Sequence, residues 1–301
     1  MPTNEDCVKA VNPARALRRD RAALWLGCAV AALGGCGEQP KPNCLTTTAP
    51  FAVKLIERER IPSACVQFTP STFGADPTVG MSAVYERDGK GQPDYFEGSL
   101  AIRTAEIGTL LDTAETYGFM NLAPGGQPHS LGKFASGRPD DDDLCKVPEL
   151  SPTRLVLPAL PPVPDDPTTE DEDESFPGQD PVDITLTWSN VQVLVTAASF
   201  GTQASAELVD ERRAPDGSSC AVRYTAVALA PAVSCQAHDA DDELLTNPDG
   251  TPQLDPALCD PEANPAMGRF FGSGISPNTK FVCDPVIAHC VIDGESIPAL
   301  R

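Results

Sequence analysis

The sequence predicts a mainly β fold, an antiparallel sandwich or barrel-like domain with one helix over about 104–117. Three observations predict it. Apolar residues alternate with polar or small ones in many short runs, which is the period of half-buried strands. Pro, Gly and Asp fill the gaps between these runs, as they do in turns. Eight cysteines follow residue 36 in a chain that carries an export signal, which predicts that the domain is disulfide-bonded.

The first 35 residues have the pattern of a secretory signal peptide. Basic residues, among them Arg18, Arg19 and Arg21, precede a run of 14 apolar or small residues from Ala22 to Gly35. This run is shorter than the roughly 20 residues of a membrane-spanning helix, and its end is rich in glycine. We expect residues 1–35 to form a disordered leader, and a buried core helix is the alternative.

The end of this run, Leu33-Gly34-Gly35-Cys36, resembles the lipobox of bacterial lipoproteins. In that family a diacylglyceryl group is attached to the cysteine thiol, the peptide before the cysteine is removed, and the new amino group is acylated. Cys28 also follows a Leu-Gly pair, but only six apolar residues precede it, so Cys36 is the better match. The resemblance implies a protein of the cell envelope, in the outer membrane, anchored to the membrane by its N-terminal acyl chains.

The chain is strongly acidic, with a net charge of −21, and residues 36–301 carry −23 because the leader is basic. Such a charge argues against nucleic-acid binding, which needs a cationic surface. It suits calcium, a cationic ligand or simple solubility. We therefore expect no nucleic-acid partner, while the envelope ligand, a protein or a polysaccharide, stays open.

The eight cysteines after Cys36 are even in number, which predicts up to four disulfides. They are Cys44, Cys65, Cys145, Cys220, Cys235, Cys259, Cys283 and Cys290. Zinc is the rival interpretation, but the chain has no Cys-x-x-Cys and its three histidines lie far apart. Cys44 and Cys65 are close enough in sequence to pair around the first strand. Cys145 is then the candidate for a bond to the C-terminal half.

Residues 36–49 contain two prolines and are expected to form a polar tether, followed by a single domain over 50–301. Alternation predicts strands at 51–55, 64–68, 81–86, 95–103 and 154–157. Residues 119–149 are expected to form a loop with at most one short strand near 131–135. The run Asp140 to Asp143 in this loop is interpreted as solvated surface.

One segment has helical spacing. Thr104 can cap its N-terminus, Glu106 suits its first turn, and Gly118 suits its end. The apolar face, interpreted as core packing, consists of Ile107, Leu110, Leu111, Ala114 and Tyr117.

Residues 158–182 contain seven prolines, eight acidic residues and no basic residue. A segment of this composition cannot bury enough apolar surface to order itself, so we expect an acidic, Pro-rich loop that interrupts the domain.

The clearest strand pattern comes next. Residues 184–188 and 191–195 both alternate, but the phase shifts by one between them. A hairpin turn at Ser189-Asn190 is the favoured explanation, and a bulge in one long strand is the other. Residues 204–208 continue the pattern, and a Pro-Asp-Gly turn leads into 222–226. The tail from 238 onward is rich in Pro and Asp, and its order is expected to depend on the cysteines.

Catalytic motifs are missing from the sequence. It contains no Gly-x-Ser-x-Gly, no His-Glu-x-x-His and no Gly-rich phosphate loop. His129, His238 and His289 lie among Pro, Gly or Asp, which favours surface positions. We expect no enzyme and no cofactor. A hydrolase is the alternative, and a pocket that holds a histidine near an Asp and a Ser would favour it.

Calcium is a third possibility. Asn247, Asp249 and Asp255 offer oxygen ligands around a glycine turn, but the residues at the first and closing positions of an EF-hand loop would be Leu245 and Pro256. We interpret the segment as an acidic loop, with a calcium-stabilised adhesive domain as the alternative.

The chain is similar to a family of myxobacterial lipoproteins labelled MlpA. The similarity rests on the segments at 35–44, 99–104 (Ser-Leu-Ala-Ile-Arg-Thr) and 231–235 (Pro-Ala-Val-Ser-Cys). It implies a lipid anchor and an envelope location, and it brings no reaction or active-site residues. We therefore expect a lipid-anchored surface protein with a binding or structural role.

The first test concerns the anchor. Cells grown with labelled palmitate are expected to label the wild-type protein and not a Cys36→Ser variant, because two or more acyl chains are needed for stable anchoring. Equal labelling of both proteins would show that Cys36 is not the modified residue.

Overall fold

The computed structural model describes residues 42–62, 76–116, 126–163, 176–239, 241–267 and 269–299. The leader 1–35, Cys36 and the strand expected at 64–68 lie outside them. The strands are β1 (Phe51–Ile61), β2 (Thr78–Arg87), β3 (Pro93–Thr104), β4 (Ser130–Lys133), β5 (Leu144–Glu149), β6 (Thr153–Leu157), β7 (Val182–Val195), β8 (Phe200–Arg213), β9 (Ser219–Leu229), β10 (Phe281–Asp284) and β11 (His289–Ile292). The helices are α2 (Ala105–Thr116) and the short 3-10 turns η1 (Pro256–Cys259) and η2 (Pro265–Met267). Within the described part of the chain, no helix has both the length and the apolar character that crossing a membrane requires.

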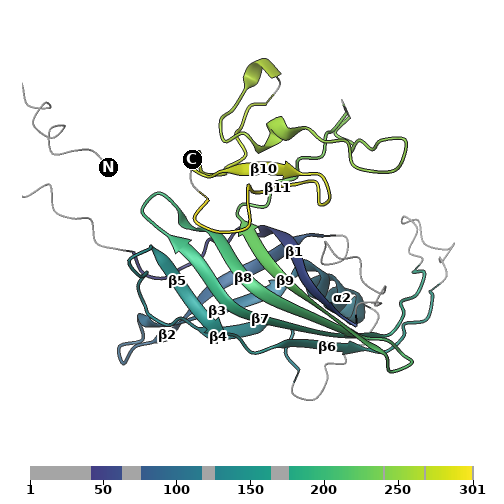
Figure 1. Cartoon of the computed structure of the whole chain (residues 1–301), viewed down its shortest axis with the longest axis horizontal. Coiled ribbons are helices and arrows are strands. Elements are labelled where there is room, and N and C mark those ends of the chain that lie inside the picture. The colour runs from purple at the N-terminus through teal and green to yellow at the C-terminus, as the bar shows by residue number, and fades with distance from the viewer. Residues whose placement is uncertain are drawn as a thin grey trace, which may run out of the picture. The chain divides into compact units, whose positions relative to one another are not determined.

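Nine strands form one antiparallel sheet in the order β4-β3-β2-β1-β9-β8-β7-β5, with β6 also paired to β7 (Figure 1). The sheet curls until β4 meets β5. The Ser151 N–H donates to the Leu131 carbonyl at 2.8 Å, and the Ala135 N–H donates to the Lys146 carbonyl at 2.8 Å. Gly132 permits this approach, because a Cβ there would overlap a backbone carbonyl of β5. Of the two expected architectures, the barrel-like one is correct.

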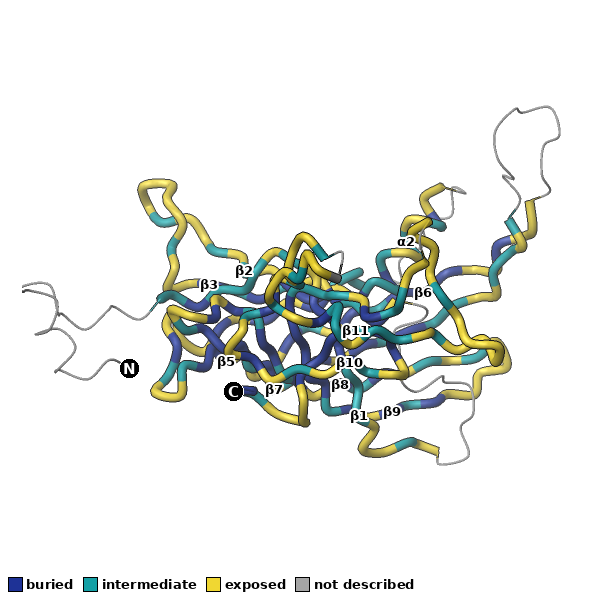
Figure 2. The backbone as a smooth tube through the Cα atoms, turned by 90° about the horizontal axis from the view of Figure 1, so that it is seen from above, coloured by how far each residue is buried: buried dark blue, intermediate teal, exposed yellow. Residues whose placement is uncertain are grey.

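The inner face of the curled sheet forms the core, seen as buried positions along the strands in Figure 2. Trp188 is the largest side chain there and is 1% exposed. Helix α2 closes one side of the core with Ile107 and Ala114, both fully buried. The Ile107 N–H donates to the Thr104 hydroxyl at 3.3 Å, which confirms the expected cap.

Strand β7 corrects the sequence prediction. The hairpin at Ser189-Asn190 is wrong, since one strand runs from Val182 to Val195 and pairs with β8 along its length. A register shift between Ser189 and Gln192 marks a bulge, at which Asn190 has φ 51°. The extra residue brings both Trp188 and Val191 to the inner face.

The loop expected over 119–149 is also partly wrong, because Leu144–Glu149 forms β5. Its Cys145 and Val147 pair with Val193 and Val191 of β7. The expected solvated run precedes it as a turn, in which Asp140 accepts the N–H of Leu144 and binds Lys146 at 2.6 Å.

Residues 42–49 do not behave as the free tether that the sequence suggested. Cys44 is bonded to Cys145, and its carbonyl accepts the Tyr85 hydroxyl at 2.5 Å. The Thr47 N–H donates to the Gly201 carbonyl at 3.2 Å. The described end of this segment is therefore attached to the sheet at its cysteine and beyond it.

The acidic excursion is ordered where it leaves and rejoins the sheet. Leu160 pairs with Gln179 and Val163 pairs with Phe176, so its two ends run antiparallel. Leu160 is only 3% exposed, which is burial that composition did not predict. Both sides of the excursion supply strands to the same sheet.

Residues 231–299, which we call the cap, contain β10, β11 and both 3-10 turns. The cap packs on the outer face of β9, where it covers Val227 and Leu229. It also engages the neighbouring strand, because the buried Gln203 amide donates to the Thr279 hydroxyl at 3.1 Å and accepts the Ala299 N–H at 2.9 Å.

The disulfides differ from the expected pairing. Cys44 pairs with Cys145, so the expected Cys44–Cys65 bond is wrong, and so is a bond from Cys145 to the C-terminal half. Cys235 pairs with Cys283, and Cys259 pairs with Cys290. Cys220 is disulfide-bonded as well.

We predict that Cys220 pairs with Cys65. Ile61 lies opposite Ala221 across the β1–β9 ladder, so Cys65 lies only a few residues beyond the position that faces Cys220. This bond would link the two sides of the acidic excursion. Protein cleaved within 164–175 should therefore stay linked on a denaturing gel until reductant is added. Separation without reductant, in protein with no free thiol, would disprove the pairing.

Candidate functional site

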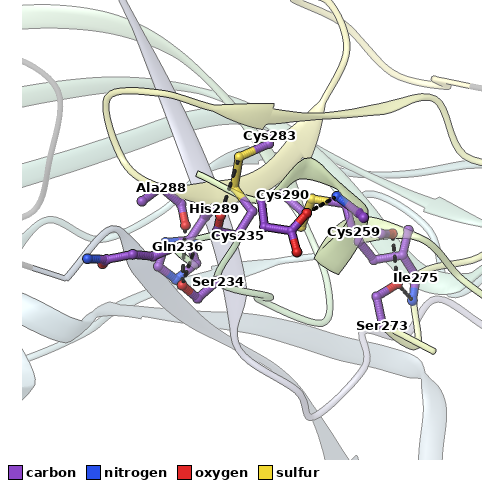
Figure 3. Close-up of a disulfide and its surroundings, with 12 residues drawn as sticks. Ser234, Cys235, Gln236, Cys259, Ser273, Ile275, Cys283, Ala288, His289 and Cys290 are labelled. Atoms are coloured by element: carbon purple, nitrogen blue, oxygen red, sulfur yellow. Dashed lines mark hydrogen bonds between the residues drawn. A yellow bond between two sulfur atoms is a disulfide. The ribbon is translucent and has the colours of Figure 1, made fainter. Parts of the chain in front are cut away.

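Two adjacent disulfides organise the cap (Figure 3). The sulfur atoms of Cys235, Cys259 and Cys290 lie within 4.8 Å of one another, and all three residues are buried. A metal would need thiolates, and here every sulfur is used in a disulfide. The cluster therefore cross-links β10, β11 and η1 to the segment that follows β9.

Beside the cystine cluster lies a loop of five residues, 269–273, which we call the Phe loop. Hydrogen bonds and an ion pair attach it to η1 and to Asp260. The Arg269 guanidinium donates to the Ala257 carbonyl and lies 3.2 Å from the Asp260 carboxylate. The Ser273 hydroxyl donates to the Cys259 carbonyl at 2.9 Å. Gly272 lies directly against Pro261, whose carbonyl oxygen would overlap any Cβ at that position. Both ends of the loop are thus held by η1 and the residues after it.

The loop exposes two adjacent aromatic side chains. Phe270 is 71% exposed and Phe271 is 88% exposed, the two highest values among the large hydrophobic residues that the structure describes. They border a hollow of about 480 Å³, which Leu258 and Val233 also line. Because the contiguous exposure of apolar side chains is costly in water, this loop is the candidate interaction surface.

A second hollow, of about 660 Å³, lies between the attached N-terminal segment and the cap. Leu45, Phe200 and Ile275 line it together with several Ser and Thr residues. Phe200 is 52% exposed, which is less than the exposure of either phenylalanine of the Phe loop.

The histidine near the Phe loop does not form a catalytic triad with the serines around it. His238 Nδ1 lies 3.2 Å from the Asp242 carboxylate, and Ser234 and Ser273 line the same hollow. Each serine hydroxyl donates to a backbone carbonyl, at 3.4 and 2.9 Å, so its proton is not directed at the imidazole. The Asp242 side chain is 94% exposed, unlike the buried carboxylate that orients a catalytic histidine.

The weak calcium candidates are turn residues. Asp249 accepts the N–H and the hydroxyl of Thr251, at 3.0 and 2.6 Å, and these hydrogen bonds lower the pKa of its carboxyl. Asp255 accepts the Ala257 N–H at 3.0 Å, and Asn247 donates to the Thr251 hydroxyl at 3.0 Å. Each of the three side chains therefore stabilises its own turn. Among the described residues, the only group that meets the geometry of a metal site is the cysteine cluster above.

A largely buried network of charged side chains lies near the C-terminal end of β8. Arg212 binds Glu106 of α2 through two hydrogen bonds of 2.7 and 2.8 Å, and it binds Asp210 at 3.0 Å. Burial raises the pKa of the Asp210 carboxyl, while Arg212 acts in the opposite direction. Burial would lower the pKa of the Arg212 guanidinium, but the two carboxylates outweigh it and raise the pKa. Burial and the Asp210 charge raise the pKa of Tyr224 to about 12.

This network joins the helix to the sheet. Glu106 was expected only to favour the first turn of the helix, and it instead binds a strand residue 106 positions away. Asp210 and Arg212 follow Leu208 at intervals of two residues, so they lie on the same, inward face of β8. This alternation is the sequence signal that could have identified them. The Phe loop was missed as well, and its signal was two consecutive aromatic residues without any alternating pattern.

The family model described as MlpA matches residues 50–231. The matched segment spans β1 to β9 and ends where the cap begins. No curated protein and no solved structure matches the chain.

The ion network predicts the effects of two neighbouring substitutions. Arg212→Met should lower the free energy of unfolding by about 3–5 kcal/mol, because it leaves the buried Asp210 and Glu106 without a counter-charge. Arg213→Met is the matched control and should cost less than about 1 kcal/mol, since Arg213 is half exposed and lies 3.9 Å from Glu211. Chemical denaturation measures both.

The same variant has a defined pH dependence. Without Arg212 the pKa of Asp210 rises further, so the folded variant binds a proton more readily than the unfolded chain does. The deficit relative to wild type should therefore shrink as the pH falls from 7 through the pKa of Asp210. A deficit that is independent of pH would show that lost packing, and not the buried charge, causes the destabilisation.

Proposed function

Because the chain belongs to the MlpA family, we propose that it is a lipid-anchored protein of the outer envelope that binds a partner and catalyses no reaction. The disulfides support an extracytoplasmic location, since such bonds persist in oxidising compartments. The lipobox-like segment before Cys36 supports the anchor, and it precedes the matched residues.

The observation that carries the binding role is the rigid exposure of Phe270 and Phe271. Most soluble proteins bury such side chains or have polar residues at these positions, so a contiguous exposed aromatic pair is typical of a binding surface. Here the hydrogen bonds of Arg269 and Ser273 hold the two rings outside the core. Aromatic residues of this kind supply much of the binding energy in protein interfaces.

The anchor limits how far the cap can reach. Seven residues separate Cys36 from Cys44, where the chain is attached to the sheet, and the eight Cα-to-Cα steps between the two cysteines span at most about 28 Å. The partner should therefore lie close to the membrane surface, as another envelope component does.

Site-specific cross-linking in living cells tests this role. A photoreactive benzoylphenylalanine at position 271 should give a discrete cross-linked product in the envelope fraction. The same residue at position 96 is the control, because Phe96 is 65% exposed but lies on β3 of the sheet. Products from both positions, or from neither, would contradict binding through the cap.

A further inference from the structure

We infer that the Phe loop binds a segment of another envelope protein that combines Lys or Arg residues with aliphatic ones. This inference rests on the proposed function and adds the chemistry of the partner. It is carried by the apolar patch together with the charges around it.

The apolar half of the surface is open and concave. The hollow beside Phe270 and Phe271 has a floor that includes Leu258 and Val233, and its volume of about 480 Å³ can hold aliphatic side chains. Arg269 is the cation on this loop, and its side chain is 16% exposed because it is bound to the Ala257 carbonyl and Asp260. Because Arg269 is already bound to these groups, its guanidinium has little capacity to bind an anionic partner.

Carboxylates of the cap lie near the hollow, although none of the described ones lines it. The Asp242 carboxylate stands beside His238 at the hollow and is 94% exposed. On the other side, the Phe loop packs against the backbone of Pro261 and Glu262, next to Asp260. The cap as a whole has eleven Asp and Glu residues over 231–299 against one Arg and one Lys. This field attracts cations and repels anions.

Charge complementarity distinguishes the partner from the other candidates. An anionic lipid surface would be repelled by the excess of carboxylates in the cap. A neutral polysaccharide would gain nothing from the negative charge of the cap. A segment with guanidinium or ammonium groups beside aliphatic side chains satisfies both halves, since the cations can pair with carboxylates and lie over the aromatic faces.

Three synthetic peptides test the inference on the oxidised, purified protein. The first alternates Leu with Arg, the second replaces Arg with Glu, and the third replaces Leu with Ser. We expect the Leu–Arg peptide to bind, the Leu–Glu peptide not to bind, and the Ser–Arg peptide to bind at least about tenfold more weakly. Fluorescence anisotropy at several salt concentrations measures this.

Variants separate the two halves of the surface. The double variant Phe270→Ser/Phe271→Ser should weaken the Leu–Arg peptide at least about tenfold, whereas Phe96→Ser should leave its binding unchanged. The double variant Asp242→Asn/Glu262→Gln should weaken binding and flatten its salt dependence. All substituted side chains lie on the surface, so unchanged melting temperatures verify the fold.

Two results would overturn the inference. Equal binding of the Leu–Arg peptide to wild type and to the Phe double variant would reveal only general attraction to an acidic protein. Preference for the Leu–Glu peptide, for vesicles of anionic lipid or for a neutral polysaccharide would refute the cationic partner. If cross-linking at position 271 still succeeds in that case, the proposed function stands and only the partner chemistry fails. If cross-linking fails as well, both fail.

Discussion

The C-terminal part of strand β9, residues 226–229, is apolar on both faces, and the two halves of the structure depend on covering those faces. Val222, Ala226 and Ala228 face the core inside the curled sheet. Val227 and Leu229 point outward and lie beneath the cap. A strand with two apolar faces is stable in water only when both are buried. The sheet and the cap therefore stabilise each other through this strand.

The cap could not remain folded by hydrophobic burial alone. Its strands β10 and β11 have four residues each, and its core cluster includes four cystine half-residues. The bonds Cys235–Cys283 and Cys259–Cys290 span 48 and 31 residues, and restriction of the unfolded chain makes each worth about 4 kcal/mol in the entropic model. Since the disulfides contribute much of the stability of the cap, the two phenylalanines of the Phe loop are not needed in its core and can face solvent.

The sequence predicted much of the sheet because its signals are local. The alternating runs located β1, β2, β3, β6, β8 and β9, and Thr104 located the start of α2. The bulge in β7 was misjudged because a hairpin and a bulge produce the same sequence pattern. In both, the alternation of apolar residues shifts by one position. Only pairing with β8 on one side and with β5 and β6 on the other decides between them. The strand β5 was missed because its six residues include Lys146 and Pro148 and gain their order from β7.

By itself, the sequence determined the mainly β class, the export pattern and the even number of cysteines after Cys36, because these follow from local periodicity and composition. The tertiary structure alone decided which cysteines pair and which phenylalanines are exposed. Cys44 bonds to Cys145 across 101 residues, since the curl of the sheet brings the N-terminal segment and β5 together. Likewise, nothing adjacent in sequence requires Phe270 and Phe271 to face water. Their exposure follows from the contacts of Arg269, Gly272 and Ser273 with the segment 257–261, and such long-range contacts leave no periodic trace in the chain.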